Sequence, residues 1–211
     1  MDKKAFIKEI LKRLKKIHPD AKIALHYKTP IELLVSTILS AQCTDVRVNI
    51  VTKDLFKKYR TPKDFASANL KEFEEEIRST GFYHNKAKNI IAAANKIVKD
   101  YNEAVPDSME KLITLPGVAR KTANVVLQGA FGKSEGIVID THVFRVTQRL
   151  GVSKEKQPEK MESELIKIVP EEQWRVYGDL LIFHGRRVCM ARKPNCTGCI
   201  LNDICPSSFK V

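Results

Sequence analysis

Hydrophobic residues recur at helical spacing along most of the chain, with polar residues between them. The first run ends before His18 and Pro19, and lysines separate its apolar positions, which are Phe6, Ile7, Ile10, Leu11, Leu14 and Ile17. This pattern predicts an amphipathic helix with a basic polar face. A second run, PIELLVSTILSAQ from Pro30, is apolar nearly all round and predicts a central buried helix.

The rest of the chain continues in the same way. Further helical patterns cover residues 44–59, 70–79, 84–101, 107–114, 120–130, 142–150, 158–168 and 171–185, with punctuation such as Thr61-Pro62 and Thr80-Gly81 between them. Nothing alternates convincingly between apolar and polar, and we expect the isolated apolar run 136–139 to be an extended connector. The sequence therefore predicts an all-α fold.

Composition and charge narrow the class of protein. The chain has 211 residues, of which 43% are hydrophobic, enough for one large or two small domains with a buried core. A net charge of +12 favours a polyanionic partner such as nucleic acid or an anionic membrane surface, although a lysine-rich surface alone would explain it. No run of about 18 apolar residues and no signal peptide is present, so we expect a cytoplasmic, nuclear or nucleoid protein.

Four of the five cysteines gather near the C-terminus in the pattern Cys189-x6-Cys196-x2-Cys199-x5-Cys205. Cytosolic thiols stay reduced, so this grouping indicates a metal site rather than disulfides. The spacing alone fits zinc and an iron–sulfur cluster about equally, and it fits unligated thiols less well. Arg192 and Lys193, between the first two cysteines, either bind phosphates or are solvated surface charges.

The segment Leu115-Pro116-Gly117-Val118-Ala119-Arg120-Lys121 joins two predicted helices as a tight hairpin. A Pro-Gly turn that leads into a helix leaves backbone N–H groups unpaired at the helix N-terminus. Together with the helix dipole, these groups bind phosphate without side-chain specificity. With the positive net charge, the hairpin favours binding to a nucleic-acid backbone, and a purely structural hairpin is the alternative.

Lys121 falls in the first turn of the second hairpin helix. The positive end of the dipole and the neighbouring Arg120 both disfavour a charged ammonium there. A lysine that loses its proton near neutral pH is what Schiff-base chemistry requires, whereas an ordinary surface lysine stays protonated and inert.

Asp140 follows the apolar run 136–139 and directly precedes the next predicted helix. The default interpretation is a helix N-cap. A carboxylate in this place also suits a general base or an electrostatic partner that projects into a cleft. His142 and Arg145, one turn further on, are better interpreted as structural or phosphate-contacting residues.

Taken together, these motifs carry a family resemblance. The hairpin LPGVARKTANVV, the following VIDTHVFRVTQRLG, the upstream LSAQCTD and GFYHNKAKNI, and the cysteine loop resemble endonuclease III over nearly the whole chain. The resemblance implies two helical lobes with a DNA-binding cleft between them. One is a six-helix barrel of residues 22–132 that carries the helix-hairpin-helix, and the other joins residues 1–21 to 133–211. It also implies a 4Fe-4S cluster, rather than zinc, held by Cys189, Cys196, Cys199 and Cys205.

The resemblance further implies a monomeric base-excision repair enzyme, an N-glycosylase and abasic-site lyase that removes oxidised pyrimidines such as thymine glycol from duplex DNA. Lys121 would be its nucleophile and Asp140 its catalytic carboxylate, at a pocket that receives a flipped base. The residues expected to contact DNA are Gln42, Phe82, Gly117, Ala119, Arg120, Arg192 and Lys193.

Some of these positions have second interpretations or depart from the family pattern. Gln42 would fill the vacated base stack, or act as a polar helix cap. Phe82 replaces the usual leucine wedge, and it stacks on a base or belongs to the core. Ala119 stands where glycine is common, and it would cost roughly 1 kcal/mol if the position needs a positive φ. We expect Cys43 to be a small buried hydrophobe.

Three other functions compete with this one. A monofunctional mismatch glycosylase is disfavoured because such relatives generally lack a lysine at position 121. A non-catalytic helix-hairpin-helix DNA-binding module and a redox-sensing iron–sulfur protein both leave the pairing of Lys121 with Asp140 unexplained.

Overall fold

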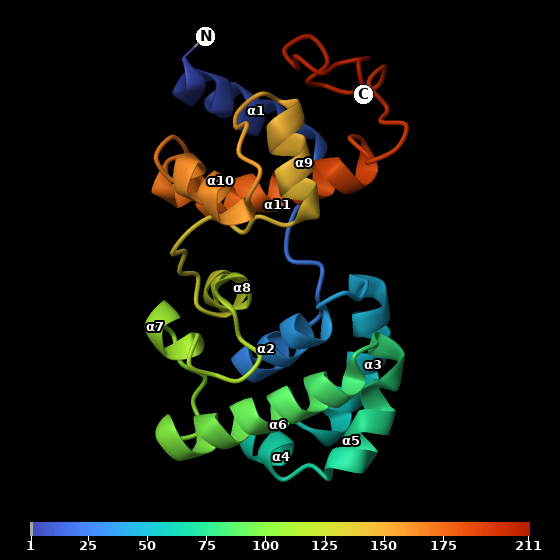
Figure 1. The fold of residues 1–211 in the computed structure, drawn as a ribbon, viewed down its shortest axis with the longest axis vertical. Coiled ribbons are helices and arrows are strands. Elements are labelled where there is room, and N and C mark those ends of the chain that lie inside the picture. Colours follow the sequence, from blue (N-terminus) through green and yellow to red (C-terminus); the bar gives the residue numbers. More distant parts are fainter. Residues whose placement is uncertain (1) are drawn as a thin grey trace. The chain divides into compact units, whose positions relative to one another are not determined.

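The computed structural model describes residues 2–211, and these form helices joined by short connections (Figure 1). The α-helices are α1 (Lys3–Ile17), α2 (Pro30–Leu39), α3 (Asp45–Lys58), α4 (Pro62–Ala66), α5 (Leu70–Ile77), α6 (Tyr83–Asp100), α7 (Met109–Leu112), α8 (Arg120–Ala130), α9 (Thr141–Arg149), α10 (Pro158–Leu165) and α11 (Trp174–Arg187). Two 3₁₀ helices are η1 (Arg78–Thr80) and η2 (Glu171–Gln173). Within residues 2–211 there is no strand, which confirms the all-α prediction. Nor is any helix in this range long and apolar enough to cross a membrane.

The chain divides into two compact units. Ala24–Glu135 forms the first, called here the contiguous unit, and the split unit combines the chain up to Ile23 with Gly136–Val211. The domains expected from the resemblance, 22–132 and 1–21 plus 133–211, divide the chain a few residues from these junctions. Met1, which was included in the second of those domains, lies outside the described residues.

Helix α2 is the centre of the contiguous unit. Every residue from Ile31 to Leu39 is buried, and Leu33 and Leu39 are completely so. Burying each such leucine stabilises the fold by about 1.5–3 kcal/mol. The helix begins at Pro30 after the cap residue Thr29, and it packs against both α8 and α6 (Figure 1). The prediction of a central buried helix from its uniformly apolar sequence is therefore confirmed.

Helix α4 was not predicted, because Thr61-Pro62 was interpreted only as a boundary between two helices. The side chain of Thr61 accepts a hydrogen bond from Asp64 N, and the Asp64 carboxylate accepts one from Thr61 N, which makes a capping box. Phe65 is fully buried, stacks on Tyr59 at 5.3 Å and meets Phe73 edge to face at 6.1 Å. A cap and one aromatic anchor thus stabilise a helix too short for its periodicity to be visible.

The split unit forms its core from both ends of the chain. Buried residues of α1, among them Ile7, Ile10 and Leu14, share one hydrophobic cluster with residues of α9 and α11. The N-terminal helix also reaches the C-terminal segment through Arg13, whose Nη1 donates to the Ile200 carbonyl at 3.0 Å. The amphipathic helix predicted at the start of the chain is thereby confirmed, with its apolar face covered by the C-terminal part of the split unit.

The apolar run 136–139 is an extended connector, as predicted. Residues 137–140 have no regular secondary structure, and Ile137 and Ile139 are buried in the core of the split unit. Their hydrophobicity therefore reflects burial of a connecting segment, and the segment leads directly into α9.

Candidate functional site

The predicted hairpin is the turn between α7 and α8 in the contiguous unit. Leu115 and Val118 are buried and anchor it, while Gly117 between them is exposed with φ +77°. A Cβ at Gly117 would lie 2.8 Å from Cβ of Asn89, closer than side-chain atoms pack. Both the left-handed backbone and this close approach require glycine, so the tight turn is fixed by sequence.

The N-terminus of α8 has no side-chain cap. Its N-cap residue, Ala119, has an extended backbone with φ −84° and ψ 167°. The position does not need a positive φ, so alanine carries no strain penalty here. An α-helix whose N-terminus lacks a side-chain cap presents the positive end of its dipole and its first N–H groups to an anion. The geometry of the hairpin thus suits a phosphate.

Lys121 is the second residue of α8 and is exposed to solvent. Arg120 precedes it and donates from Nη2 to the Glu135 carbonyl at 2.9 Å. This bond ties the start of α8 to the end of the contiguous unit. Arg120 therefore positions the helix turn that carries Lys121, in addition to contributing positive charge there.

Three residues predicted to contact DNA line one cavity in the contiguous unit. They are Gln42, Phe82 and Gly117, and the other lining residues are Thr37, Ile38, Ala41, Asn85, Lys86, Asn89 and Thr122. Gln42 and Phe82 both have left-handed backbones, with φ 53° and 50°, which costs a non-glycine residue roughly 1–2 kcal/mol. Strained residues of this kind gather at binding sites. Phe82 is 63% exposed, which excludes the core interpretation.

Cys43 follows Gln42 in the loop after α2. It is a free thiol and only partly buried, so the expectation of a small buried hydrophobe is wrong. The reason is local, because the chain leaves the core after Leu39 and residues 41 and 42 are exposed.

Asp140 is the N-cap of α9 in the split unit, which confirms the default interpretation of this residue. Its Oδ1 accepts hydrogen bonds from the backbone N–H groups of His142 and Val143, both at 2.8 Å. Because both bonds use Oδ1, the second carboxylate oxygen takes no part in the cap. The cap therefore fixes the carboxylate without using all of its capacity as an acceptor.

Two arginines on α9 hold the start of the cysteine loop. Arg145 Nη2 donates to the carbonyls of Gly185 at 2.9 Å and Cys189 at 3.0 Å, which identifies it as structural. Arg149 donates from Nη1 to the Met190 carbonyl at 2.7 Å and from Nη2 to that of Ala191 at 3.0 Å. The next two residues along this anchored loop are Arg192 and Lys193, and both are exposed.

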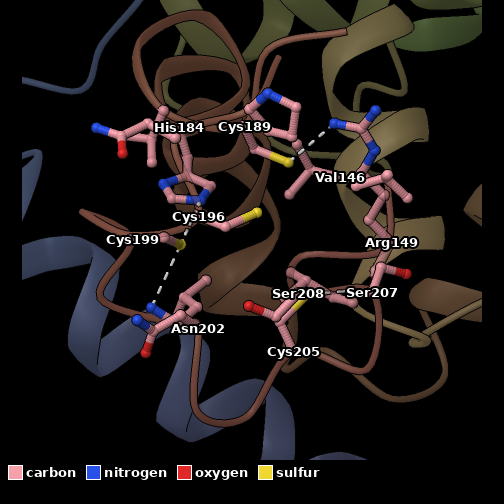
Figure 2. Close-up of a pocket in the computed structure, with 16 residues that line it drawn as sticks. Val146, Arg149, His184, Cys189, Cys196, Cys199, Asn202, Cys205, Ser207 and Ser208 are labelled. Atoms are coloured by element: carbon pink, nitrogen blue, oxygen red, sulfur yellow. Dashed lines mark hydrogen bonds between the residues drawn. The ribbon is translucent and has the colours of Figure 1, made fainter. Parts of the chain in front are cut away.

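All four C-terminal cysteines line one cavity of the split unit, and Figure 2 shows their side chains arranged around a common space. Arg149 also lines this cavity, and its Nη1 lies 3.4 Å from Cys189 Sγ. Within residues 2–211, no three His, Cys, Asp or Glu side chains are arranged to hold a single metal ion. Soft thiolates spread around a space fit an iron–sulfur cluster, whose ligands bind different iron atoms.

Other features of this cavity also fit such a group. The Ser208 hydroxyl oxygen is buried without a hydrogen-bond partner, and Ser208 lines the same cavity. Burial raises the pKa of the Cys199 and Cys205 thiols, so without a cation both favour the neutral form. Bound iron would reverse that preference, since ligation requires the thiolate and releases the proton.

A buried imidazole lies beside one of these thiols. His184 is 2% exposed, and its Nε2 lies 3.6 Å from Cys199 Sγ, while its Nδ1 lies 3.4 Å from Nε2 of the buried His18. Burial lowers the pKa of His184 to about 4, so the ring is neutral at pH 7. A side chain that contacts a metal-ligating residue orients that residue, so His184 would orient the Cys199 thiol for ligation.

The cavity lined by Gln42, Phe82 and Gly117 also contains polar residues that the sequence analysis did not single out. Lys86 is buried in its wall, between Asn85 and Asn89 of the same helix. The sequence does contain a signal for it, because Lys86 occupies the apolar stripe of α6 together with Ala87 and Ile90. A lysine on the buried face of an amphipathic helix is unusual and indicates a specific partner.

The comparisons with known proteins agree with one another. Residues 35–171 match the HhH-GPD superfamily of base excision DNA repair proteins, and residues 189–205 match the iron-sulfur binding domain of endonuclease III. Endonuclease III of Synechocystis sp. is 52% identical over 206 residues, covering 98% of this chain and 94% of that protein. A non-covalent endonuclease III–DNA complex is similar in structure, with a TM-score of 0.93, 44% identity, and coverage of 100% of this chain and 98% of that one. A trapped covalent endonuclease III–DNA intermediate, an estranged-adenine complex, has the same TM-score and identity and coverage of 100% and 99%.

Proposed function

Because the chain belongs to the endonuclease III family of base-excision repair DNA glycosylases with abasic-site lyase activity, we propose that Lys121 is its nucleophile and Asp140 its catalytic carboxylate. Oxidised pyrimidines such as thymine glycol are the typical substrates of this family. The observation that carries the proposal is the place of Lys121 in the first turn of an α8 that lacks a side-chain cap, directly after the Gly117 turn. Borohydride reduction of an enzyme–DNA imine tests it.

The chemistry assigned to Lys121 proceeds in balanced steps. Nζ of the neutral amine attacks C1′, the glycosidic C–N bond breaks, and its electron pair leaves with the damaged base, which takes up a proton. The nitrogen then loses one proton, and its lone pair breaks the C1′–O4′ bond; O4′ takes up a proton as the ring opens, which leaves a protonated imine at C1′. The imine acidifies the proton at C2′. Loss of that proton forms the C2′–C3′ double bond and expels the 3′ phosphate, which is β-elimination.

Asp140 is proposed to act while the glycosidic bond breaks. Its carboxylate supports deprotonation of Lys121 and stabilises the positive charge that develops on the sugar. The α9 cap supports this role, because it holds Oδ1 with two backbone N–H groups and leaves Oδ2 outside the cap. A carboxylate fixed in this way loses little entropy when it meets a transition state.

A 4Fe-4S cluster is the cofactor of this family, and the four cysteines that line the cavity in the split unit would hold it. When bound, the cluster supplies a rigid metal-centred crosslink for the C-terminal loop. The surrounding residues then keep this loop in place, since Arg149 contacts the Cys189 sulfur and two carbonyls of the loop.

Protein purified without chelator should be yellow-brown, with a broad thiolate-to-iron absorption and equal amounts of iron and sulfide. The reason is the four-thiol cavity, which fits a cluster with several iron atoms. Metal analysis and labile sulfide determination measure this directly. Zinc as the only metal, after anaerobic preparation and with DNA activity intact, would contradict the assignment.

We further propose that the enzyme acts as a monomer at the nucleoid, on duplexes that contain damaged bases or abasic sites. Main-chain N–H groups of the hairpin at Gly117, Ala119 and Arg120 would bind one phosphate, and Arg192 and Lys193 would bind others. Gln42 and Phe82 would enter the base stack, since both are exposed on strained turns at one cavity.

Binding to undamaged duplex should weaken steeply with salt, log K falling with log salt concentration by about 0.9 for each phosphate neutralised. Lys193→Ala should make this slope shallower by about 0.9, the loss of one phosphate contact. Lys193 suits such a contact because it is exposed on a loop held by α9. Fluorescence anisotropy between 50 and 200 mM salt gives the slope.

Lys12→Ala is the matched control for this measurement, since Lys12 is an exposed lysine on α1 of the same unit. Its slope should equal that of the unmodified protein. If Lys193→Ala also leaves the slope unchanged, the cysteine loop does not contact phosphate.

A further inference from the structure

We propose that Lys86 is a positioning residue, which fixes the two strained turns that carry Gln42 and Phe82 so that both side chains are already presented before DNA binds. This inference rests on the proposed function, in which Gln42 and Phe82 enter the base stack. It assigns a role to a buried side chain that need not touch the DNA itself.

Lys86 joins two segments that are distant in sequence. It lies on the first turns of α6, is 5% exposed, and donates from Nζ to the carbonyls of Leu39 and Thr80, each at 2.8 Å. Leu39 is the last residue of α2, and Thr80 is the last residue of η1. Carbonyls at helix C-termini lack intrahelical partners and carry the negative end of the dipole, so an ammonium is a suitable donor for both.

A strained residue follows each of these carbonyls within a few positions. Gln42 follows Leu39 with φ 53°, and Phe82 follows Thr80 and Gly81 with φ 50°. The backbone of Lys86 contributes as well, since its N–H donates to the Phe82 carbonyl at 3.1 Å. Left-handed residues persist only where their surroundings determine the conformation. Lys86 supplies that constraint at both turns.

A packing role does not account for a charged group at this place. The other buried positions of α6 are Ala87, Ile90, Ala93, Ala94 and Ile97, all apolar. Burial lowers the pKa of Lys86, because desolvation disfavours the charged ammonium, so placing a lysine here carries a cost that an apolar residue would not. Both of its hydrogen-bond acceptors are main-chain carbonyls, so the residue acts on backbone geometry. The two backbones that it holds are those leading to Gln42 and Phe82.

The test compares Lys86→Met with the unmodified holoenzyme. Affinity for a duplex with a tetrahydrofuran abasic analogue should fall about tenfold, which is 1.4 kcal/mol. Affinity for undamaged duplex should be unchanged, because phosphate contacts come from elsewhere. Hydrogen exchange of the free protein should be faster at residues 40–43 and 80–83. Lys86→Arg, which keeps a charged donor, should restore most of the discrimination. Lys88→Met, an exposed lysine on the same helix, is the matched control.

A mutant cycle then separates this proposal from the proposed DNA contacts. In a Gln42→Ala, Phe82→Ala background, Lys86→Met should cause no further loss of specific binding, because the side chains that it positions are gone. An equal tenfold loss in that background would overturn the proposal, since Lys86 would then act independently of both. If the double alanine variant binds the abasic analogue normally, the assignment of Gln42 and Phe82 as DNA contacts fails instead.

Hydrogen exchange of Lys86→Met and the variant Lys86→Gln provide two further tests. Unchanged exchange at residues 40–43 and 80–83 in Lys86→Met would show that Lys86 does not hold these turns, whatever the binding data show. Should Lys86→Met not fold, Lys86→Gln keeps a donor group, an uncharged amide on a shorter side chain. It should then give an intermediate loss of discrimination, and full discrimination in this variant would overturn the proposal.

Discussion

We expect Lys121→Gln to abolish both borohydride trapping and strand cleavage at abasic sites. Glutamine has no amine that can form an imine with C1′, so both readouts should fall by roughly 10³-fold or more. DNA affinity should persist, because the hairpin offers main-chain groups to the phosphate. Since Lys121 is exposed and glutamine is a good helix former, the free energy of unfolding should change by less than about 0.5 kcal/mol.

The matched control is Lys111→Gln, an exposed lysine of α7 in the same helix-hairpin-helix. It should be trapped on an abasic duplex as efficiently as the unmodified enzyme. Single-turnover trapping followed by denaturing gel electrophoresis gives the rates. A borohydride-stable link in Lys121→Gln at nearly the unmodified rate would mean that another amine is the nucleophile.

Asp140→Asn should separate the two halves of the reaction. Excision of thymine glycol should drop by roughly 10²–10⁴-fold, because the variant loses the negative charge that supports base release. Cleavage at a preformed abasic site should survive in part, since no glycosidic bond has to break there. The α9 cap should also survive, because the amide oxygen of asparagine accepts the same N–H groups and caps helices as well as aspartate does.

Asp140→Ala provides the structural comparison. It loses the charge and the cap together, so it should be destabilised by about 1 kcal/mol relative to Asp140→Asn. Thermal unfolding measures that difference, and single-turnover rates on the two substrates measure the chemistry. If Asp140→Asn excises the base at the unmodified rate, Asp140 is only a cap.

The helices that could be predicted from sequence are those whose buried faces repeat over several turns. Helices α1 and α6 are of this kind, because burial on one side of a long helix leaves a periodic pattern. Helix α2 could be predicted for another reason, since it is buried all round and its sequence is uniformly apolar. Helix α4 depends instead on a capping box and on Phe65, whose aromatic partners lie elsewhere in the sequence. That dependence is tertiary, and no local pattern reveals it.

The candidate site divides in a similar way. The Gly117 turn, the lysine that follows it and the four-cysteine loop could be predicted, because each places its chemistry within a short segment. The left-handed backbones of Gln42 and Phe82 could not, since non-glycine residues adopt them only under constraints from other segments. Lys86 illustrates that constraint, because its acceptors, the Leu39 and Thr80 carbonyls, come from two other helices.

The division of the split unit between the two ends of the chain has a consequence for synthesis on the ribosome. Helix α1 is made before α11, yet its apolar face packs in a core with α11, which follows about 160 residues later. At typical translation rates of about 5–20 residues per second, that delay is on the order of 10–30 s. The contiguous unit has all of its residues available before then. The four cysteines follow α11 in the chain, so they are made after every residue of the contiguous unit.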